Sequence, residues 1–197
     1  MPIEEAQRIH HHRIQQVRDA LASVPLLHPA LTLEVGCGHG HFLTAYAAVH
    51  PSEHCIALDI IADRLERAER KTTKAGLTNV NWLRASAAEF LEAIPPEVRF
   101  RGRIFILFPD PWPKRKHWKN RLIQPEFLDQ LAAHTAPGIE MCFRTDYAPY
   151  FEAASHIIAN HLLWDIDAAT PWPFEAKTVF EARASGFQSL IAKRAAP

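Results

Sequence analysis

Short apolar segments alternate with helix-forming segments over the first half of the chain, and this alternation restricts the fold more than any other feature. Strands are predicted at 31–35, 54–59, 79–84 and 103–108, and helices between them at 41–50, 62–75 and 87–93. Residues 103–108 (RIFILF) are almost continuously apolar, as expected of a parallel strand that is buried on both faces. Strands that alternate with helices predict an α/β fold with a mostly parallel sheet.

The second half continues the pattern and then changes it. Helices are predicted at about 125–134 and 149–161 with a strand at 139–144 between them, and the runs at 164–168 and 187–192 predict an antiparallel pair of strands. The sheet is therefore expected to have seven strands. Residues 3–23 predict an N-terminal helix, so residues 1–25 are interpreted as a helical extension and residues 26–197 as one domain.

Composition excludes several classes of protein. The chain of 197 residues is 48% hydrophobic, as in ordinary globular domains, and it lacks the apolar run of about 18 residues that a membrane span needs. A cytoplasmic protein is expected. The three cysteines, Cys37, Cys55 and Cys142, have no CxxC spacing, so buried reduced thiols are expected rather than disulfides, and no metal site is predicted.

Charge is balanced over the whole chain but not along it. The 22 basic and 22 acidic residues cancel, which by itself argues against a nucleic-acid-binding protein. Residues 99–121, however, hold eight basic residues and one acidic residue. Phosphate contacts are local, so this distribution still allows a focused RNA-binding face.

A glycine-rich turn between the first strand and its helix indicates a ligand site. Gly36, Gly38 and Gly40 follow Glu34, so the spacing is G-x-G-x-G rather than the G-x-G-x-x-G of dinucleotide-binding turns. Glu34 would repel a pyrophosphate but attract the cationic amino and sulfonium groups of S-adenosylmethionine. Asp59, at the end of the second strand, is placed to bind ribose hydroxyls. The pattern favours S-adenosylmethionine over NAD, and over a turn that binds no ligand.

A second segment, FPDPWPKRKHWKNR at 108–121, follows the fourth strand and combines one carboxylate, two tryptophans and five lysine or arginine residues. Prolines at 109, 111 and 113 stiffen the backbone around Asp110. A basic run alone is often only a solvated surface, but one with flanking tryptophans beside a cofactor site suits RNA. Trp112 either stacks on a base or packs within its own loop.

The sequence resembles the bacterial tRNA (guanine-N7)-methyltransferases. The resemblance rests on LEVGCGHGHF (33–42), FPDPWPKRKHWKNR (108–121), RTDYAPYFE (144–152) and TVFEAR (178–183). It implies a Rossmann-like class I methyltransferase fold, S-adenosylmethionine as the methyl donor, and tRNA as the partner. The product would be 7-methylguanosine at position 46, in the variable loop.

The resemblance also assigns roles by position. It implies that Glu34, Gly36, Gly38, Gly40, Asp59, Ser86 and Asp110 bind the cofactor, that Asp110 is catalytic, and that Lys114, Asp146, Thr178, Phe180 and Glu181 bind the substrate. Two positions depart from the family. Ser86 stands where an acidic residue is usual, and Val179 replaces the lysine of a T-K-F-E motif.

Mechanistically, N7 of guanine carries a lone pair and no proton, so methylation needs no general base. A carboxylate near the ring would stabilise the positive charge that develops there, which is the role expected of Asp110, with Asp146 as a second candidate. Arg144 either pairs with Asp146 or contacts RNA. The rival interpretation, motivated by Ser86 and Val179, is a non-catalytic RNA-binding or partner-stabilising protein on a methyltransferase scaffold. The short N-terminal extension favours a monomer over an obligate oligomer.

Overall fold

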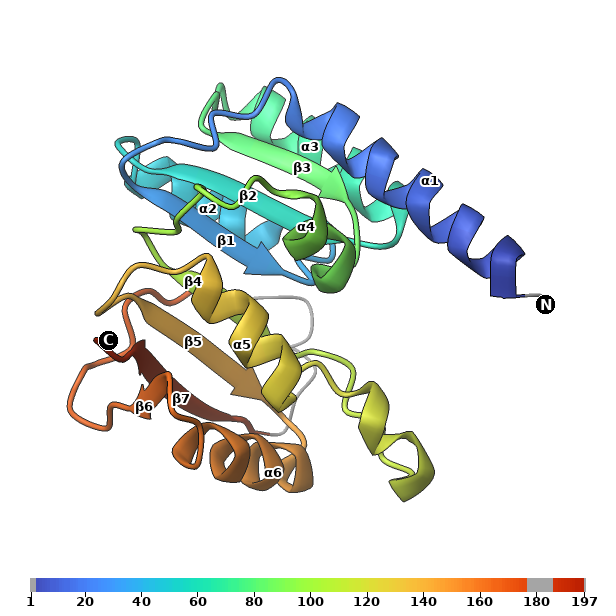
Figure 1. The fold of residues 1–197 in the computed structure, drawn as a ribbon. Coiled ribbons are helices and arrows are strands. Elements are labelled where there is room, and N and C mark those ends of the chain that lie inside the picture. Colours follow the sequence, from blue (N-terminus) through green and yellow to red (C-terminus); the bar gives the residue numbers. More distant parts are fainter. Residues whose placement is uncertain (1–2, 177–185, 197) are drawn as a thin grey trace.

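The fold was determined as a computed structural model, which describes residues 3–176 and 186–196. A seven-stranded sheet runs through the molecule in the order β3-β2-β1-β4-β5-β7-β6 (Figure 1). The strands are β1 (Leu31–Val35), β2 (His54–Asp59), β3 (Val80–Arg84), β4 (Ile104–Leu107), β5 (Glu140–Thr145), β6 (Trp164–Ile166) and β7 (Gln188–Arg194). The five strands from β3 to β5 are parallel, whereas β7 is antiparallel to both β5 and β6. The mostly parallel α/β sheet and its antiparallel pair are thus confirmed.

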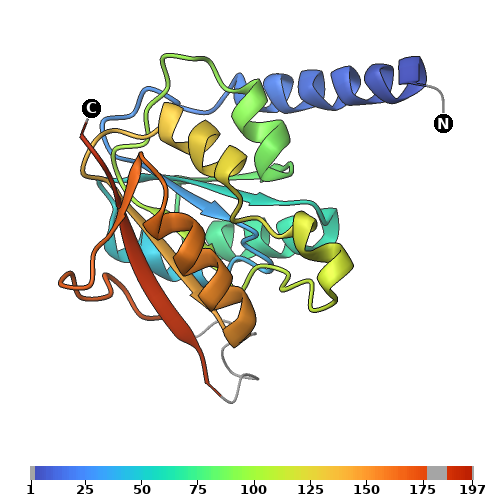
Figure 2. The ribbon, with the colours of Figure 1, turned by 60° about the horizontal axis from the view of Figure 1, so that its bottom comes forward.

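Helices cover both faces of the sheet (Figures 1 and 2). They are α1 (Ile3–Leu21), α2 (His41–Val49), α3 (Ala62–Lys74), α4 (Ala87–Ala93), α5 (Pro125–Ala133) and α6 (Ala148–Ala159), with a 3-10 helix, η1, at Arg115–Asn120. One buried cluster joins α1, α4, α5 and α6 to one face, and a second joins α2 and α3 to the other. No helix in the described part of the chain is both long enough and apolar enough to span a membrane.

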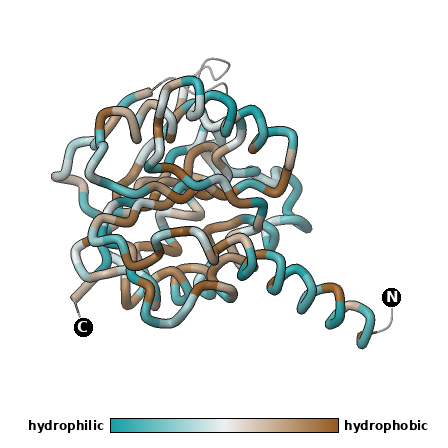
Figure 3. Tube along the Cα trace, turned by 90° about the horizontal axis from the view of Figure 1, so that it is seen from above, coloured by the Kyte–Doolittle hydropathy of each residue, from teal (hydrophilic) through white to brown (hydrophobic). Residues whose placement is uncertain are grey.

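Burial follows the apolar pattern of the strands. All residues of β1, β2 and β4 are buried, and the centre of the trace is mainly hydrophobic, while the projecting N-terminal helix is largely hydrophilic (Figure 3). Helix α1 buries only Ile14, Val17 and Leu21, so its first half projects from the domain (Figure 2). The chain crosses from β3 to the far side of β1 to form β4. Ligands of such sheets bind at the carboxyl ends of the strands near this reversal.

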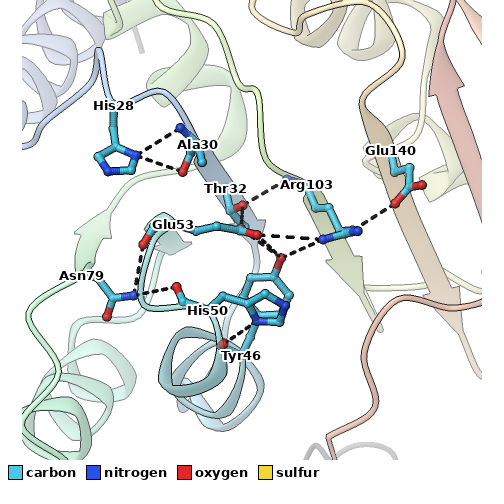
Figure 4. A network of polar contacts seen from close by, with 9 residues as sticks. All are labelled: His28, Ala30, Thr32, Tyr46, His50, Glu53, Asn79, Arg103 and Glu140. Carbon is cyan, nitrogen blue, oxygen red and sulfur yellow. Dashed lines mark hydrogen bonds and ion pairs between the residues drawn. The ribbon is translucent and has the colours of Figure 1, made fainter.

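The opposite edge of the sheet, at the amino ends of the strands, is held by a polar network (Figure 4). The hydroxyl of Tyr46, a fully buried residue, donates to the carboxylate of Glu53 at 2.9 Å and accepts from Nη1 of Arg103 at 3.2 Å. Thr32 donates to the same carboxylate at 2.5 Å, and Arg103 donates to Glu140 at 2.9 Å. The network therefore joins α2 to the starts of β1, β4 and β5.

We predict that Tyr46→Phe lowers the free energy of unfolding by about 1 kcal/mol, because it leaves Glu53 and Arg103 each short of a hydrogen bond in a half-buried site. Urea denaturation measures this change. Tyr147→Phe is the matched control, because within the described residues the Tyr147 hydroxyl makes no hydrogen bond. An equal loss in both variants would show that the network adds nothing to stability.

Candidate functional site at the carboxyl edge of the sheet

Five of the predicted site residues lie at one edge of the sheet. Glu34 lies near the end of β1 and Asp59 ends β2, while Ser86, Asp110 and Asp146 follow β3, β4 and β5. These five strands are parallel, so their carboxyl ends meet at the same edge. The chain reverses its strand order between β1 and β4, which places the glycine turn and Asp110 on either side of the reversal.

The glycine turn has the backbone conformation that its composition predicts. Gly36, Gly38 and Gly40 have φ values of 76°, 55° and 68°, in the left-handed region that favours glycine. At Gly40 the constraint is also one of space, because an added Cβ would lie 2.5 Å from Cβ of Ala68 and 2.5 Å from the ring of Trp82. At Gly36 an added Cβ would meet nothing within 4 Å. Helix α3 can therefore pack directly against the turn only because residue 40 is glycine.

We predict that Gly40→Ala lowers the free energy of unfolding by about 3 kcal/mol, from backbone strain together with overpacking. Gly36→Ala carries only the strain, so about 1 kcal/mol is expected. Chemical denaturation of the two variants side by side separates the two contributions. Equal losses would mean that the contact of Gly40 with α3 and β3 has no energetic weight.

Asp59 fixes the turn to the end of β2. Its Oδ2 accepts from the backbone N–H of Gly38 at 2.9 Å, and its Oδ1 accepts from that of Ile61 at 2.9 Å. Arg64 of α3 lies 3.6 Å from Oδ2. The carboxylate is buried, so both oxygens are held in one orientation at the mouth of the turn. Each oxygen accepts more than one hydrogen bond in proteins, and a ligand hydroxyl can share them.

Glu34 is a buried acid whose Oε2 has no hydrogen-bond partner in the described structure. Desolvation, and then the negative charge of Asp59, raise the pKa of Glu34 to about 8, although the backbone N–H of Leu43 works in the opposite direction. An unpaired buried acid is costly to ionise. A cationic ligand beside Glu34 would supply the missing partner, so the site suits a positively charged group.

The raised pKa of Glu34 makes stability depend on pH. Between the ordinary value of 4.5 and about 8, the folded chain retains a proton that the unfolded chain releases, so stability falls as the pH rises, by up to about 1.4 kcal/mol per pH unit. We predict that Glu34→Gln removes this slope, because the neutral amide resembles the protonated acid. Urea denaturation at pH 5.5, 6.5 and 7.5 tests it, with the exposed Glu126→Gln as control. A wild-type slope in Glu34→Gln would contradict the assignment.

Ser86 is engaged in a helix cap. Its hydroxyl accepts from the backbone N–H of Glu89 at 3.2 Å, and Oε2 of Glu89 accepts from the backbone N–H of Ser86 at 2.9 Å, which completes a capping box at the start of α4. The hydroxyl also donates to the same Oε2 at 2.9 Å. Arg13 of α1 lies 3.5 Å from the other oxygen of Glu89. A groove of about 390 Å³ opens here, lined by Ile60 and Ser86 and by Arg13 and Gln16 of α1. Ser86 stands where the family usually has an acidic residue, and the carboxylate that contacts Ser86 in this structure is that of Glu89.

The segment after β4 is strained and exposed. Phe108 and Trp112 have φ values of 50° and 44°, which bulky residues rarely adopt, and such strain is typical of functional sites. Asp110 lies between them with its carboxylate exposed, and Lys114 is exposed just before η1. Sequence reasoning did not predict η1; the prolines end at 113, so the following residues are free to form a helical turn.

Two residues of this segment support it from within. The guanidinium of Arg121 is buried, donates to the carbonyl of Pro111 at 2.9 Å, and lies 4.5 Å from the ring centre of Trp118. Trp112 lies 5.7 Å from the ring of His117, so in this structure it packs within its own loop. Arg121 therefore anchors the loop, and the exposed cations are those from Lys114 to Lys119.

Arg144 is also an anchoring residue. It is 4% exposed, makes two hydrogen bonds to Glu175 at 2.8 and 2.9 Å, and lies 4.1 Å from the ring centre of Trp172. Within the described residues, Arg144 thus pairs with Glu175, while Asp146 is exposed. The predicted substrate residues Thr178, Phe180 and Glu181, with Val179, lie outside the described residues.

The three cysteines form no disulfide among the described residues. Cys37, Cys55 and Cys142 are free and buried, as the sequence predicts, and burial raises the pKa of Cys55 and of Cys142 to about 12. Within residues 3–176 and 186–196, no three metal-ligating side chains gather around one point.

Comparison with known proteins identifies the class. Two solved methyltransferases share the fold: the 16S rRNA methyltransferase KamB has a TM-score of 0.60 at 20% identity over 92% of each chain. An rRNA methylase from Streptococcus thermophilus has a TM-score of 0.58 at 10% identity, over 94% of this chain and 96% of the other. The architecture is therefore the Rossmann-like fold of class I methyltransferases.

Sequence comparison gives the family. The family model described as "Putative methyltransferase" matches residues 28–188, and the chain belongs to this family. It is similar to the tRNA (guanine-N(7)-)-methyltransferase of Magnetococcus marinus, with 34% identity over 73% of this chain and 56% of the relative. The enzyme of that name from Rhodospirillum rubrum is 34% identical over 78% and 62%. The chain spans little more than half the length of these curated relatives.

Proposed function

We propose that this chain transfers a methyl group from S-adenosylmethionine to N7 of a guanine in tRNA, forming 7-methylguanosine. The observation that carries the proposal is the buried Glu34 side chain beside the glycine turn, whose Oε2 has no hydrogen-bond partner in the described structure. Glu34 belongs to β1, and the strained, cationic segment at 108–121 follows β4, the strand on the other side of the reversal in strand order. The names of the similar relatives support the choice of tRNA and of N7.

The residues at the carboxyl edge fit the proposed cofactor. Glu34 would face its cationic amino and sulfonium groups, and the ionised form of Glu34 would then gain the partner that it lacks. Asp59, held by Gly38 and Ile61, would accept hydrogen bonds from the ribose hydroxyls. Gly36 leaves open space in which a ligand can approach the backbone. The groove at Ser86 and Ile60 would receive the adenine.

When bound, S-adenosylmethionine supplies a methyl group whose bond to sulfur breaks as the bond to N7 forms. No side chain has to remove a proton, because N7 presents a lone pair. Asp110 is exposed on a strained segment, where its carboxylate can accept hydrogen bonds from the N–H groups of the guanine edge. The ring becomes positively charged during transfer, so a carboxylate beside it stabilises the transition state more than the bound substrate.

Binding of tRNA is assigned to the exposed cations from Lys114 to Lys119, with Asp146 after the neighbouring strand. Thr178, Phe180 and Glu181 are proposed to contact the same substrate on the basis of sequence alone. The target base must leave its stack to reach the donor, which a cationic surface beside the site favours by holding the flanking phosphates.

The proposal is tested by incubating the purified chain with labelled S-adenosylmethionine and unmodified tRNA. The nucleosides are then analysed for label. Label is expected in 7-methylguanosine. We predict that Asp110→Asn lowers kcat by about 100-fold, because the amide carries no negative charge to stabilise the cationic ring. The control is Asp165→Asn, which removes an exposed carboxylate from the far edge of the sheet.

Two results would overturn this assignment. Full methylation by Asp110→Asn at saturating donor would remove the electrostatic role from that residue. Binding of tRNA without detectable binding of S-adenosylmethionine would favour the non-catalytic scaffold, an alternative that the engagement of the Ser86 hydroxyl by Glu89 supports.

A further inference from the structure

The outer face of α3 carries a cluster of cations that the function above does not use. Arg67, Arg70, Lys71 and Lys74 are spaced i, i+3, i+4 and i+7, so they share one face of the helix. The residues that α3 buries, Leu65, Ala68 and Thr72, lie on the opposite face. The four cations line a groove of about 470 Å³ together with His39 and His41, and we call this the α3 groove.

In the described part of the chain, no carboxylate lines the α3 groove. No carboxylate in residues 3–176 or 186–196 forms an ion pair with Arg67, Arg70, Lys71 or Lys74, although Arg64 of the same helix lies near Asp59. Lys71 instead donates to the carbonyl of His39 at 2.6 Å and to Nε2 of His41 at 2.9 Å. The groove therefore gathers cations and hydrogen-bond donors without an internal anion.

The local chemistry agrees with this arrangement. Burial, and then the charge of Arg67, lower the pKa of both Lys71 and His39. Nδ1 of His39 is buried and has no partner in the described structure. An anion in the α3 groove would relieve the repulsion among the cations. It would also accept hydrogen bonds from their N–H groups. Among protein surfaces, clusters of arginine and lysine of this kind suit phosphate groups.

The position of the groove relates it to the proposed substrate. His39 and His41 flank the last glycine of the turn, and α3 joins β2 to β3, on one side of β1. The cationic segment at 114–119 follows β4, on the other side of β1. Two cationic surfaces thus flank the carboxyl ends of the central strands, α3 behind the sheet and η1 beyond its carboxyl edge in Figure 1.

We propose that the α3 groove binds backbone phosphates of the tRNA, as a second contact separate from the segment at 114–119. This inference rests on the proposed function, because it assigns the same partner. A long polyanion can reach both surfaces at once, so each surface raises the effective concentration of tRNA at the other. The contact adds affinity and orientation without reading sequence.

The test is Arg67→Gln with Arg70→Gln, measured by tRNA binding at several salt concentrations. Both side chains are exposed, and glutamine keeps the helix propensity, so the fold is retained. The dissociation constant is expected to rise at least 10-fold at low salt. The slope of log affinity against log salt is expected to fall by about two, at roughly 0.9 per phosphate contact on a duplex. Calorimetric binding of S-adenosylmethionine is expected to be unchanged.

The matched control is Arg99→Gln with Arg101→Gln, which removes two arginines just before β4, at the amino edge of the sheet. It is expected to bind tRNA as the wild type does. A wild-type dissociation constant and slope in the α3 variant would overturn the inference, as would an equal loss in the control, which would indicate a general effect of charge. If tripolyphosphate binds the wild type but not the α3 variant, and tRNA binding is unaffected, the groove is a site for free anions instead.

These outcomes are distinct from failure of the proposed function. Absence of 7-methylguanosine from the wild-type reaction counts against that function, whatever the α3 variant does. Wild-type methylation together with unaltered tRNA binding by the variant counts against the α3 groove alone.

Discussion

The hydrogen bond from the backbone of Gly38 to Asp59 is the interaction on which the carboxyl edge depends. It joins the turn after β1 to the end of β2, so the turn cannot move independently of the sheet. Because the turn is fixed, Ala68 and Trp82 can pack closely against Gly40. This contact sets the position of α3. The backbone of the glycine turn therefore determines the positions of both the buried Asp59 carboxylate and the cations of α3.

Opposite charges are sorted by depth at this edge. The acids Glu34 and Asp59 are buried where the turn meets the strands, while the cations of α3 and of residues 114–119 lie towards solvent. Such an arrangement suits a small cationic ligand inside and a large polyanion outside. It also explains how a chain with no net charge can present two strongly positive surfaces.

Much of this architecture could be predicted from the sequence because its strands are short and apolar and its turns carry glycine or proline. The predicted bounds of β1 and β2 are those of the structure, and the other strands differ at their ends, where pairing rather than pattern decides. The edge at which the acids and Ser86 gather also followed from the pattern, since Glu34, Asp59, Ser86, Asp110 and Asp146 lie within a predicted strand or shortly after its end. Contact with a ligand depends on partners that a sequence does not display.

Other features depended on contacts between distant segments. Arg121 belongs to the basic run by sequence, but Pro111 and the ring of Tyr150 hold it inside, so it is lost from the cationic surface. Ser86 is engaged by Glu89, three residues away, a pairing that the S-x-x-E spacing could have shown. The four cations of α3 stand among the acidic residues Asp63, Glu66 and Glu69 in the sequence, so the helical spacing that gathers them on one face is less evident than a continuous basic run.

Arg121 also determines how the site could be rebuilt. Its guanidinium donates to the carbonyl of Pro111 in the segment after β4 and lies over Tyr150, which belongs to the helix after β5. The two loops that carry Asp110 and Asp146 are thus joined through one side chain. A graft of the 108–121 loop onto another sheet of this fold would need the start of α6 as well, so the pair of loops is the smallest transferable unit of the substrate side.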